Sequence, residues 1–269
     1  MASSALPIID HIVILVSHTT LLALPDILGN TFTVVIGGSH TDGLTHNNLI
    51  LLQDGSYIEF IAFFDGIAPE RRAAHRWGRR PENTVIDWAY TLPHGADFKA
   101  VQQRVVAAQA VYVYEDPVDG GRTRPDGAVL KWAVAAARDR RRDARVDAGK
   151  LPFWCLDHTS RDLRVPYEGN PQTEHPSGAR GVSRISVRVP AEEVLGLSKV
   201  YDGIHDSLDR EGHSWRFGTY ARTEAGEGQH DVELGRAPGE GGIEVVLLGD
   251  GESPESVEIL PGLVLKFEV

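Results

Sequence analysis

The sequence predicts an α+β fold in which βαβββ modules repeat along the chain and form curved mixed sheets. Two strongly apolar segments, 9–16 and 57–64, each carry one ligand-type side chain near the start, His11 and Glu59. A strand, a helix and three strands succeed one another twice, and a third, module-like part follows. The chain has 269 residues and 42% apolar content, which is ample for the core that such sheets need.

The first module spans residues 9–64. Its pattern predicts a strand over 9–16, a helix around 20–28 and strands near 31–36, 47–53 and 56–64, with Gly37-Gly38 and Asp54-Gly55 in turns. Alternate residues of a strand share a face, so His11 and Glu59 each lie among apolar neighbours and are expected to be buried. A buried polar side chain needs a partner. A His and a carboxylate on neighbouring strands indicate either an acid/base pair or the start of a metal site.

The second module spans 85–157 and the third begins at Val182. The second is predicted to have a strand over 85–90, a helix near 95–109, where apolar residues recur at helical spacing, and strands near 111–115, 128–137 and 151–157. The third is predicted to have a helix near 191–210, strands near 213–218, 229–235 and 243–248, and a last strand at Leu263–Phe267. We expect residues 1–166 to form the paired modules and 167–269 a C-terminal module packed on them.

Charge and composition limit the class of partner. With 38 acidic and 27 basic side chains, the net charge of -11 disfavours nucleic acid and anionic membranes as partners. Cys155 is the lone cysteine, so no intrachain disulfide is expected. The N-terminal residues lack the pattern of a secretory signal, and no apolar run reaches the ~20 residues of a membrane helix. A cytoplasmic protein, either monomer or homodimer, is expected.

Several common catalytic signatures are absent from the sequence. It has no Gly-x-Ser-x-Gly elbow, no phosphate-binding Gly-x-x-x-x-Gly-Lys loop and no dinucleotide fingerprint, so no nucleotide cofactor is expected. Cys155 and His158 lie close together in the chain, but on a strand they point to opposite faces. Cys155 is therefore interpreted as a small buried filler rather than a nucleophile.

A set of short stretches occurs in a fixed order between position 9 and about 190. They are Asp10-His11-Ile12-Val13, Gly37-Gly38-Ser39-His40, Gly43-Leu44-Thr45-His46-Asn47, Asp54-Gly55-Ser56-Tyr57-Ile58-Glu59, Ile86-Asp87-Trp88-Ala89, Gly121-Arg122-Thr123-Arg124-Pro125-Asp126-Gly127, Leu130-Lys131-Trp132, Leu151-Pro152-Phe153-Trp154-Cys155-Leu156-Asp157, Arg164-Val165-Pro166 and His175-Pro176-Ser177-Gly178. Together they resemble glyoxalase-like members of the vicinal oxygen chelate superfamily.

The resemblance implies a cup made of paired modules, with metal ligands on the first and last strands of each module. His11 and Glu59 match the two positions of the first module. In the second module Trp88 stands where His11 stands and Phe153 stands roughly where Glu59 stands, and neither binds a metal. Asp157, on the same strand face as Phe153, is then the candidate third ligand. The implied ion is a divalent metal, either Fe, Mn, Zn or Ni.

The implied pocket takes a small oxygen-bearing molecule, with His11 and Glu59 as its catalytic residues. Its predicted substrate-binding residues are His40, Asn47, Trp88, Tyr90, Arg124, Trp132, Arg164 and His175. Arginines suit this role because the guanidinium is a planar fork that holds a carbonyl or carboxylate. For the histidines and arginines the alternative is a loop or surface residue that satisfies local groups.

Three functions remain open on the sequence alone. A metalloenzyme would chelate two vicinal oxygens of its substrate; a metal-free isomerase or cyclase would use His11 and Glu59 as acid and base; a binding protein would sequester a small molecule without turnover. In the third module Glu244 echoes Glu59 and Arg184 takes the place of His11. There we expect a structural ion pair between Arg184 and Glu244 on a half-solvated sheet.

Overall fold

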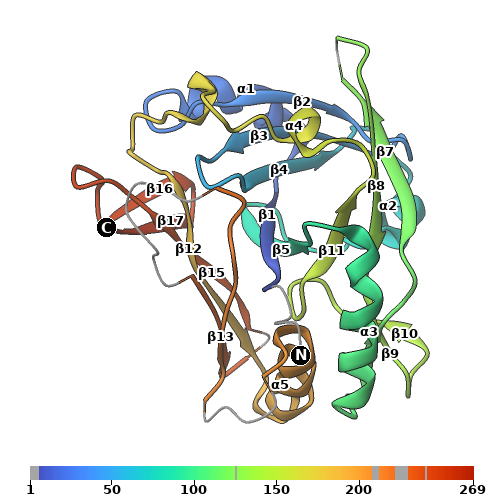
Figure 1. Ribbon diagram of the computed structural model, residues 1–269. Helices are drawn as coiled ribbons and strands as arrows, with labels where there is room; N and C mark the ends of the chain where they lie inside the picture. Colours follow the sequence, from blue (N-terminus) through green and yellow to red (C-terminus); the bar gives the residue numbers. More distant parts are fainter. Residues whose placement is uncertain (1–5, 125, 208–211, 222–229, 240) are drawn as a thin grey trace.

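The structure is a computed structural model that describes residues 6–124, 126–207, 212–221, 230–239 and 241–269 (Figure 1). The helices are α1 (His18–Leu28), α2 (Pro69–Ala74), α3 (Phe98–Ala107), α4 (Arg161–Arg164) and α5 (Ala191–His205), with 3-10 turns η1 (Gly95–Asp97) and η2 (Pro171–Thr173). The strands are β1 (Ile8–Leu15), β2 (Val35–Ser39), β3 (Thr45–Leu51), β4 (Tyr57–Phe63), β5 (Thr84–Thr91), β6 (Tyr112–Tyr114), β7 (Val118–Thr123), β8 (Val129–Ala135), β9 (Ala137–Asp139), β10 (Ala144–Arg145), β11 (Phe153–Asp157), β12 (Gly181–Val189), β13 (Ser214–Arg216), β14 (Asp231–Arg236), β15 (Gly242–Leu248), β16 (Ser256–Leu260) and β17 (Leu263–Glu268). The predicted α+β fold with curved mixed sheets is confirmed.

The first two modules share one eight-stranded sheet with the strand order β2-β3-β4-β1-β5-β11-β8-β7. In each half the first strand pairs in parallel with the last, β1 with β4 and β5 with β11, and the halves join where β1 and β5 pair antiparallel. The first module matches its prediction in the order of elements, but β2 begins at Val35, and Gly37 and Gly38 lie within this strand and not in the predicted turn. In the second, the segment near 111–115 is wrongly predicted as part of this sheet, because β6 belongs to a separate three-stranded sheet, β10-β9-β6.

The edge position in the second module belongs to β7, which was not predicted. Its sequence contains Gly120 and Gly121, and paired glycines read as a turn rather than a strand. The sheet curves so far that its two edges meet: an antiparallel bridge joins His40, just after β2, to Arg122 of β7. The inner face of the sheet therefore lines an almost closed cup (Figure 1).

The C-terminal sheet repeats this pairing pattern with fewer strands. Its order is β13-β14-β12-β15-β17-β16, with β12 and β14 parallel, β12 and β15 antiparallel, and β15 and β17 parallel. The prediction that the segment near 243–248 is the last strand of the third module is therefore wrong. This segment is β15, which begins a second half of the C-terminal sheet, as β5 does in the eight-stranded sheet. Residues 208–210 of the predicted helix and 229 of a predicted strand lie outside the described residues.

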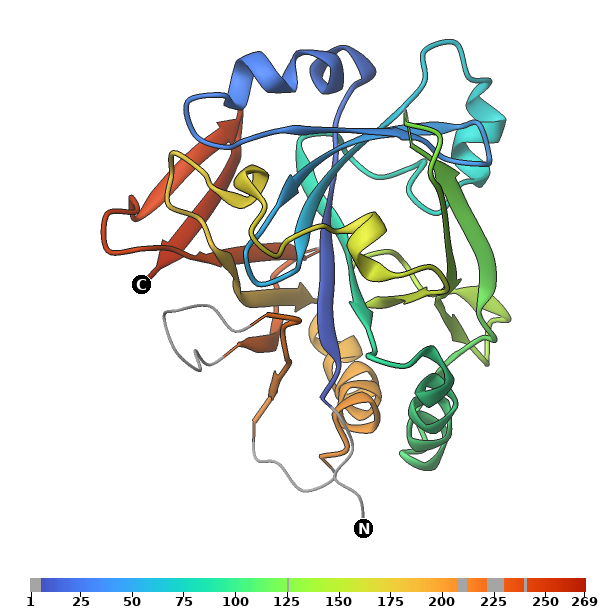
Figure 2. The same cartoon turned by 45° about the horizontal axis from the view of Figure 1, so that its top comes forward.

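One large core joins the outer face of the eight-stranded sheet to helices α1, α3 and α5 and to the C-terminal sheet. The N-terminal helix α1 begins where Ser17 Oγ accepts the N–H of Thr20 and buries Leu21, Leu24 and Leu28 at helical spacing. Helices α3 and α5 lie side by side (Figure 2). A Cβ at Gly203 of α5 would lie 2.7 Å from Cα of Val105, so this close approach requires glycine.

A smaller apolar cluster lies on the inner face of the cup. It contains the side chains of Val13, Leu15, Ile61, Phe63, Ile86, Ala89, Phe153 and Cys155, with Trp77 and Trp132 packed against it. Apolar walls of this kind exclude water from the polar groups set among them, and this strengthens electrostatic interactions there. No described helix is long and apolar enough to cross a membrane.

Candidate functional site

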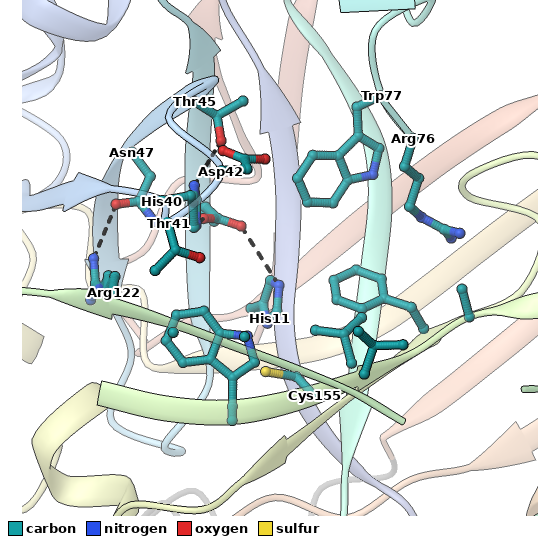
Figure 3. Close-up of a pocket in the computed structure, with 18 of the residues that line it drawn as sticks. His11, His40, Thr41, Asp42, Thr45, Asn47, Arg76, Trp77, Arg122 and Cys155 are labelled. Carbon is teal, nitrogen blue, oxygen red and sulfur yellow. Dashed lines mark hydrogen bonds and ion pairs between the residues drawn. The ribbon is translucent and has the colours of Figure 1, made fainter. Parts of the chain in front are cut away.

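A cavity of about 370 Å³ occupies the cup, lined by side chains from β1, β3, β4, β7, β8 and β11. Its lining includes His11, His40, Asn47, Tyr57, Glu59, Trp77, Arg122, Trp132, Phe153 and Arg164. Figure 3 shows His11, His40, Asn47, Arg122 and Cys155 around this space. A mostly apolar cavity of this size with a few converging polar groups is the usual form of a small-molecule site.

His11 is buried on β1 and its imidazole is held from three sides. Its Nδ1 lies 2.5 Å from Asp10 Oδ1, its ring stacks on Tyr57 with centroids 4.6 Å apart, and Phe153 meets it edge-on at 5.2 Å. The ionised Asp10 carboxylate is only an acceptor, so Nδ1 carries the proton and donates it to Asp10. In neutral His11, Nε2 is then the basic nitrogen, and it lies 3.7 Å from Glu59 Oε2.

Asp10 is fully buried and its charge is balanced by two arginines. Arg164 donates to both of its oxygens, at 2.8 and 2.7 Å, and Arg161 donates to Oδ2 at 2.7 Å. Burial alone would raise the pKa of Asp10, but the two guanidinium groups hold it well below its usual value of 3.8. Asp157 completes the cluster, since Arg164 binds it through Nε and Nη2 at 2.7 and 2.8 Å.

Glu59 is the carboxyl side chain that faces His11 in the cavity, and it is only 4% exposed. Asn47 Nδ2 donates to its Oε1 at 2.5 Å, and His40 Nε2 lies 3.6 Å from the same oxygen. The Nδ1 of His40 is in turn 2.8 Å from the hydroxyl of Thr45. Two imidazoles therefore present Nε2 to one carboxylate, with each Nδ1 occupied by a side-chain oxygen.

Several predicted residues line the cavity as expected. They are His11, Glu59, His40, Asn47, Trp132 and Arg164. Arg164 nevertheless differs from its predicted role, because its nitrogens are already bound to Asp10, Asp157 and the hydroxyl of Tyr57. It holds the protein's own carboxylates and not a substrate.

Trp88 and Tyr90 do not line the cavity. Both are fully buried on the opposite face of β5, where Trp88 stacks with Tyr201 of α5 at 6.4 Å. The reason is a bulge at Ile86, which shifts the pairing of β5 with β1 by one residue. A shift of one residue moves every later side chain to the other face.

The same shift changes which residue matches His11 in the second module. His11 pairs with Ala89 and Val13 pairs with Asp87, so Asp87, not Trp88, holds the mirror position of His11. Asp87 is fully buried and accepts from Arg76 Nε at 2.6 Å and Trp77 Nε1 at 2.7 Å. The equivalence of Phe153 with Glu59 is confirmed, because Phe153 pairs with Ala89 as Glu59 pairs with Val13.

Arg124 and His175 lie outside the cavity. Arg124 is ion-paired with Asp126 at 2.7 Å and donates to Leu163 O at 3.0 Å. His175 bridges two backbone groups: its Nδ1 accepts the N–H of Thr33 at 3.1 Å, and its Nε2 donates to Leu51 O at 2.8 Å. Both satisfy local groups and contribute no donor to the site.

Cys155 lies at the cavity wall, buried. Burial raises the pKa of its thiol well above the usual value, so the thiol stays protonated at neutral pH. A protonated thiol is a poor nucleophile. This agrees with its interpretation as a filler.

The donor set decides whether the metal implied by the fold family fits. Asp157 is 13% exposed and bound by Arg161 and Arg164, so it cannot serve as the third ligand. In the second module the matching positions hold Asp87, neutralised by Arg76, and Phe153. Across the described ranges of the chain no group of three or more His, Cys, Asp or Glu side chains is placed to hold a metal ion. The residues present therefore do not fit a metal bound as in the paired modules of the resemblance.

Four contributors to the site were not predicted from the sequence: Asp10, Tyr57, Arg122 and Trp77. Only the apolar alternation around β1 and β4 carried a signal, and it pointed to His11 and Glu59. Asp10 sits at a bulge between Ile9 and His11, where alternation fails. Trp77 and Arg122 come from a loop and from a glycine-rich strand, which carry no periodic pattern.

Comparison with known proteins gives a family model and several folds. A model described as a glyoxalase-like domain matches residues 9–198. No curated protein matches the sequence. The crystal structure of a hypothetical protein from Staphylococcus aureus is similar over 97% of this chain and 99% of that one, with 14% identity and a TM-score of 0.68.

Two further solved structures are more distant. A xylose isomerase-like TIM barrel/4-hydroxyphenylpyruvate dioxygenase fusion protein is similar over 92% of this chain but 37% of its own length, with 14% identity and a TM-score of 0.51. The Mn(II)-bound glyoxalase from Novosphingobium aromaticivorans covers 91% of this chain and 66% of its own, with 12% identity and a TM-score of 0.44. At 14% identity, the likeness to the Staphylococcus aureus protein and to the fusion protein shows the fold alone.

Proposed function

Because the chain belongs to the glyoxalase-like domain family, in the vicinal oxygen chelate superfamily, we propose that it is an enzyme that moves a proton on a small oxygenated molecule. The acid/base pair is His11 and Glu59, facing each other in the cavity. The observation that carries the proposal is the state of His11. Its Nδ1 is committed to a buried, ionised Asp10, and its Nε2 faces the cavity 3.7 Å from Glu59.

This arrangement fixes which nitrogen acts. Asp10 holds the imidazole in one tautomer and orientation, and its negative charge stabilises the imidazolium that forms when Nε2 takes a proton. Ring stacking on Tyr57 restricts rotation further. A general base must be held within reach of the proton that it removes, and its pKa matters only once this geometric condition is met.

The chemistry that suits this pair is proton removal from a carbon next to a carbonyl. His11 Nε2 takes the proton, and the electron pair of the C–H bond moves into the carbonyl as an enolate. Protonated Glu59 donates its proton to the adjacent carbon of the enolate system, the former carbonyl carbon, which completes an isomerisation. The proton on His11 Nε2 then passes to Glu59, 3.7 Å away, and both groups regain their starting forms. His11 and Glu59 are 3% and 4% exposed and lie beside the apolar cluster of the inner face, which limits the access of water to the transferred proton.

The test is solvent deuterium exchange, followed by NMR on a panel of 2-oxo aldehydes, 2-oxo acids and 2-hydroxy ketones. We expect the wild type to exchange the C–H next to the carbonyl of at least one compound. His11→Gln and Glu59→Gln should slow that exchange by about 100- to 10,000-fold, the usual contribution of a general base. Glu233→Gln, which changes a carboxylate in the C-terminal sheet, is the matched control and should leave the rate unchanged.

Two results would overturn the proposal. One is exchange that persists at the wild-type rate in both variants. The other is a wild type that binds members of the panel and exchanges none of them, which would indicate a binding protein. Elemental analysis of protein purified without chelator tests the metal-dependent alternative: one equivalent of Fe, Mn, Zn or Ni, lost in both His11→Ala and Glu59→Ala, would establish it.

A further inference from the structure

Arg122 differs from the other buried arginines of the described residues, Arg161 and Arg164, because it has no acidic partner. It is 6% exposed and lines the cavity from β7, where the two edges of the sheet meet. Its Nη1 donates to Asn47 Oδ1 at 3.0 Å (Figure 3). Within the described parts of the chain, no carboxylate lies within ion-pair distance of its guanidinium.

The neighbouring buried arginines show what is missing. Arg161 and Arg164 neutralise Asp10 and Asp157, and Arg76 neutralises Asp87. Removing a charge from water without a counter-charge is costly, so a buried unpaired arginine is rare in a structural role. Burial lowers the pKa of Arg122 despite the nearby Tyr57 and Glu59, which is the electrostatic effect expected when a buried cation lacks a close partner.

The guanidinium is held in place rather than left to turn. Asn47 Oδ1 also accepts the N–H of Gly38 at 2.9 Å, while Asn47 Nδ2 donates to Glu59. A Cβ at Gly37 would fall 2.0 Å from Asn47 Oδ1 and 2.9 Å from Arg122 Nη1, so this packing requires glycine there. Asn47 thus sets the position of Arg122 relative to the carboxylate of Glu59.

We propose that Arg122 binds the carboxylate of the substrate, and that the cavity therefore takes small 2-oxo or 2-hydroxy acids. This assignment rests on the proposed function, because it names the substrate class of the same site. The planar fork of arginine matches a carboxylate with two parallel hydrogen bonds, and the single hydrogen bond from Nη1 to Asn47 leaves the other donors of Arg122 for that purpose. A bound carboxylate would supply the counter-charge that the protein does not.

The position of Arg122 also orients the substrate. With its carboxylate at Arg122, an acid of this size extends across the cavity toward His11 and Glu59, which are linked to Arg122 through Asn47. Four of the five acidic side chains that line the cavity, Asp42, Glu115, Asp116 and Asp119, are between 41% and 90% exposed, so their repulsion of an anion is screened by solvent. The fifth, Glu59, is buried, and the proposed function uses it in its protonated form, which carries no charge.

The experiment compares matched acids and esters. The probes are pyruvate, phenylpyruvate and lactate, each beside its methyl ester, with binding measured by calorimetry and by the fluorescence of Trp77 and Trp132, which line the cavity. We expect at least one acid to bind the wild type about tenfold or more tightly than its ester. Arg122→Gln should remove that preference, and Arg122→Lys, which keeps the charge without the fork, should retain part of it.

Arg124→Gln is the matched control, since Arg124 lies two residues further along, outside the cavity and paired with Asp126. It should bind as the wild type does. The proposal is overturned by an Arg122→Gln variant, folded by thermal melting, that keeps the acid preference, by an equal loss in Arg124→Gln, or by a wild type that prefers none of the acids.

The outcome is separable from that of the proposed function. His11→Gln should abolish deuterium exchange while it keeps the preference for the acid, because His11 does not contact Arg122. Acid binding through Arg122 without any exchange in the wild type would leave this assignment standing and refute the proton transfer.

Discussion

The two sheets of this protein carry matching pairs of titratable side chains in opposite surroundings. In the eight-stranded sheet His11 pairs with Tyr57 of the parallel neighbour and faces Glu59, two residues on. In the C-terminal sheet Arg184 pairs with Asp231 and faces Glu233, also two residues on. The closest atoms of the two pairs are 3.7 and 3.8 Å apart.

The backbone shows that these positions are equivalent. A bulge precedes His11, between Ile9 and His11, and another precedes Arg184, between Val182 and Arg184. The expected pair of Arg184 with Glu244 is wrong, because β15 takes the position of β5 and Glu244 instead binds Lys266 at 2.9 Å. Arg184 pairs with Glu233 and Glu268.

The difference lies in burial. The side chains of His11 and Glu59 are 4% and 6% exposed, whereas those of Arg184 and Glu233 are 40% and 39% exposed. An exposed ion pair contributes about 0–1 kcal/mol and its charges are screened. A buried ion pair shifts the pKa values of its two groups and strongly affects the free energy of unfolding. The same strand geometry thus builds a site in one sheet and a solvated surface in the other.

The largest expected effect comes from the two bulge residues, Asp10 and Ser183. Asp10→Asn leaves two buried arginines short of one negative charge, so we expect a loss of about 3–5 kcal/mol in the free energy of unfolding. Ser183→Ala removes one hydrogen bond to Glu268 and should cost about 1 kcal/mol. Urea denaturation of both variants measures the difference.

Equal losses of unfolding free energy in the two variants would show that burial does not make these equivalent positions differ. If Asp10→Asn is too unstable to purify, Asp157→Asn provides a second measurement, since Asp157 binds the same two arginines with 13% of its side chain exposed. The loss in the free energy of unfolding for Asp157→Asn should lie between those for Asp10→Asn and Ser183→Ala, because water screens part of the charge that is removed.

The connection between the sheets gives a pH-dependent prediction at His175. Burial lowers the pKa of His175 below its usual value of 6.5, although the hydrogen bond to Leu51 opposes this. The unfolded chain therefore binds a proton at His175 before the folded protein does, and stability is complete above pH 6.5 and falls as the pH drops below it. Protonation of His175 at Nδ1 would also remove the hydrogen bond that Nδ1 accepts from the N–H of Thr33.

His175→Gln keeps a donor and an acceptor but does not titrate. Its unfolding free energy should change less than that of the wild type between pH 7.5 and pH 5.5. The control is His213→Gln, an exposed histidine of the C-terminal sheet, which should keep the wild-type pH dependence. A wild-type slope in His175→Gln would contradict the assignment. Burial also lowers the pKa values of His46 and His75, so these two histidines contribute to the slope that remains.

The sequence predicted the parts of this site that depend on local periodicity. His11 and Glu59 lie on strands with period-two patterns, so the face of each side chain followed directly. The prediction that Trp88 and Tyr90 line the cavity was wrong because the bulge at Ile86 interrupts this period-two pattern. No residue type in the sequence indicates that bulge. The cluster of Asp10 with Arg161 and Arg164 joins groups more than 150 positions apart, and Arg122 reaches Asn47 only after the sheet curls.

The fold shows the same division. The order of strands and helices in the first module followed from turns and apolar runs, whereas the assignment of β15 did not. A strand that ends one half and a strand that begins the next have similar apolar patterns, and only their partners differ. Pairing partners are set by tertiary packing, which one sequence does not display.

The smallest expected effect is on the exposed pair itself. Arg184→Met should change the free energy of unfolding by less than about 1 kcal/mol, because both Arg184 and its partner Glu233 are two-fifths exposed. The aliphatic part of methionine keeps most of the packing of the arginine stem, so the change isolates the charge. High salt should reduce the effect further. A loss comparable with that of Asp10→Asn would mean that solvent does not screen this pair, and burial would then no longer explain why equivalent positions in the two sheets behave differently.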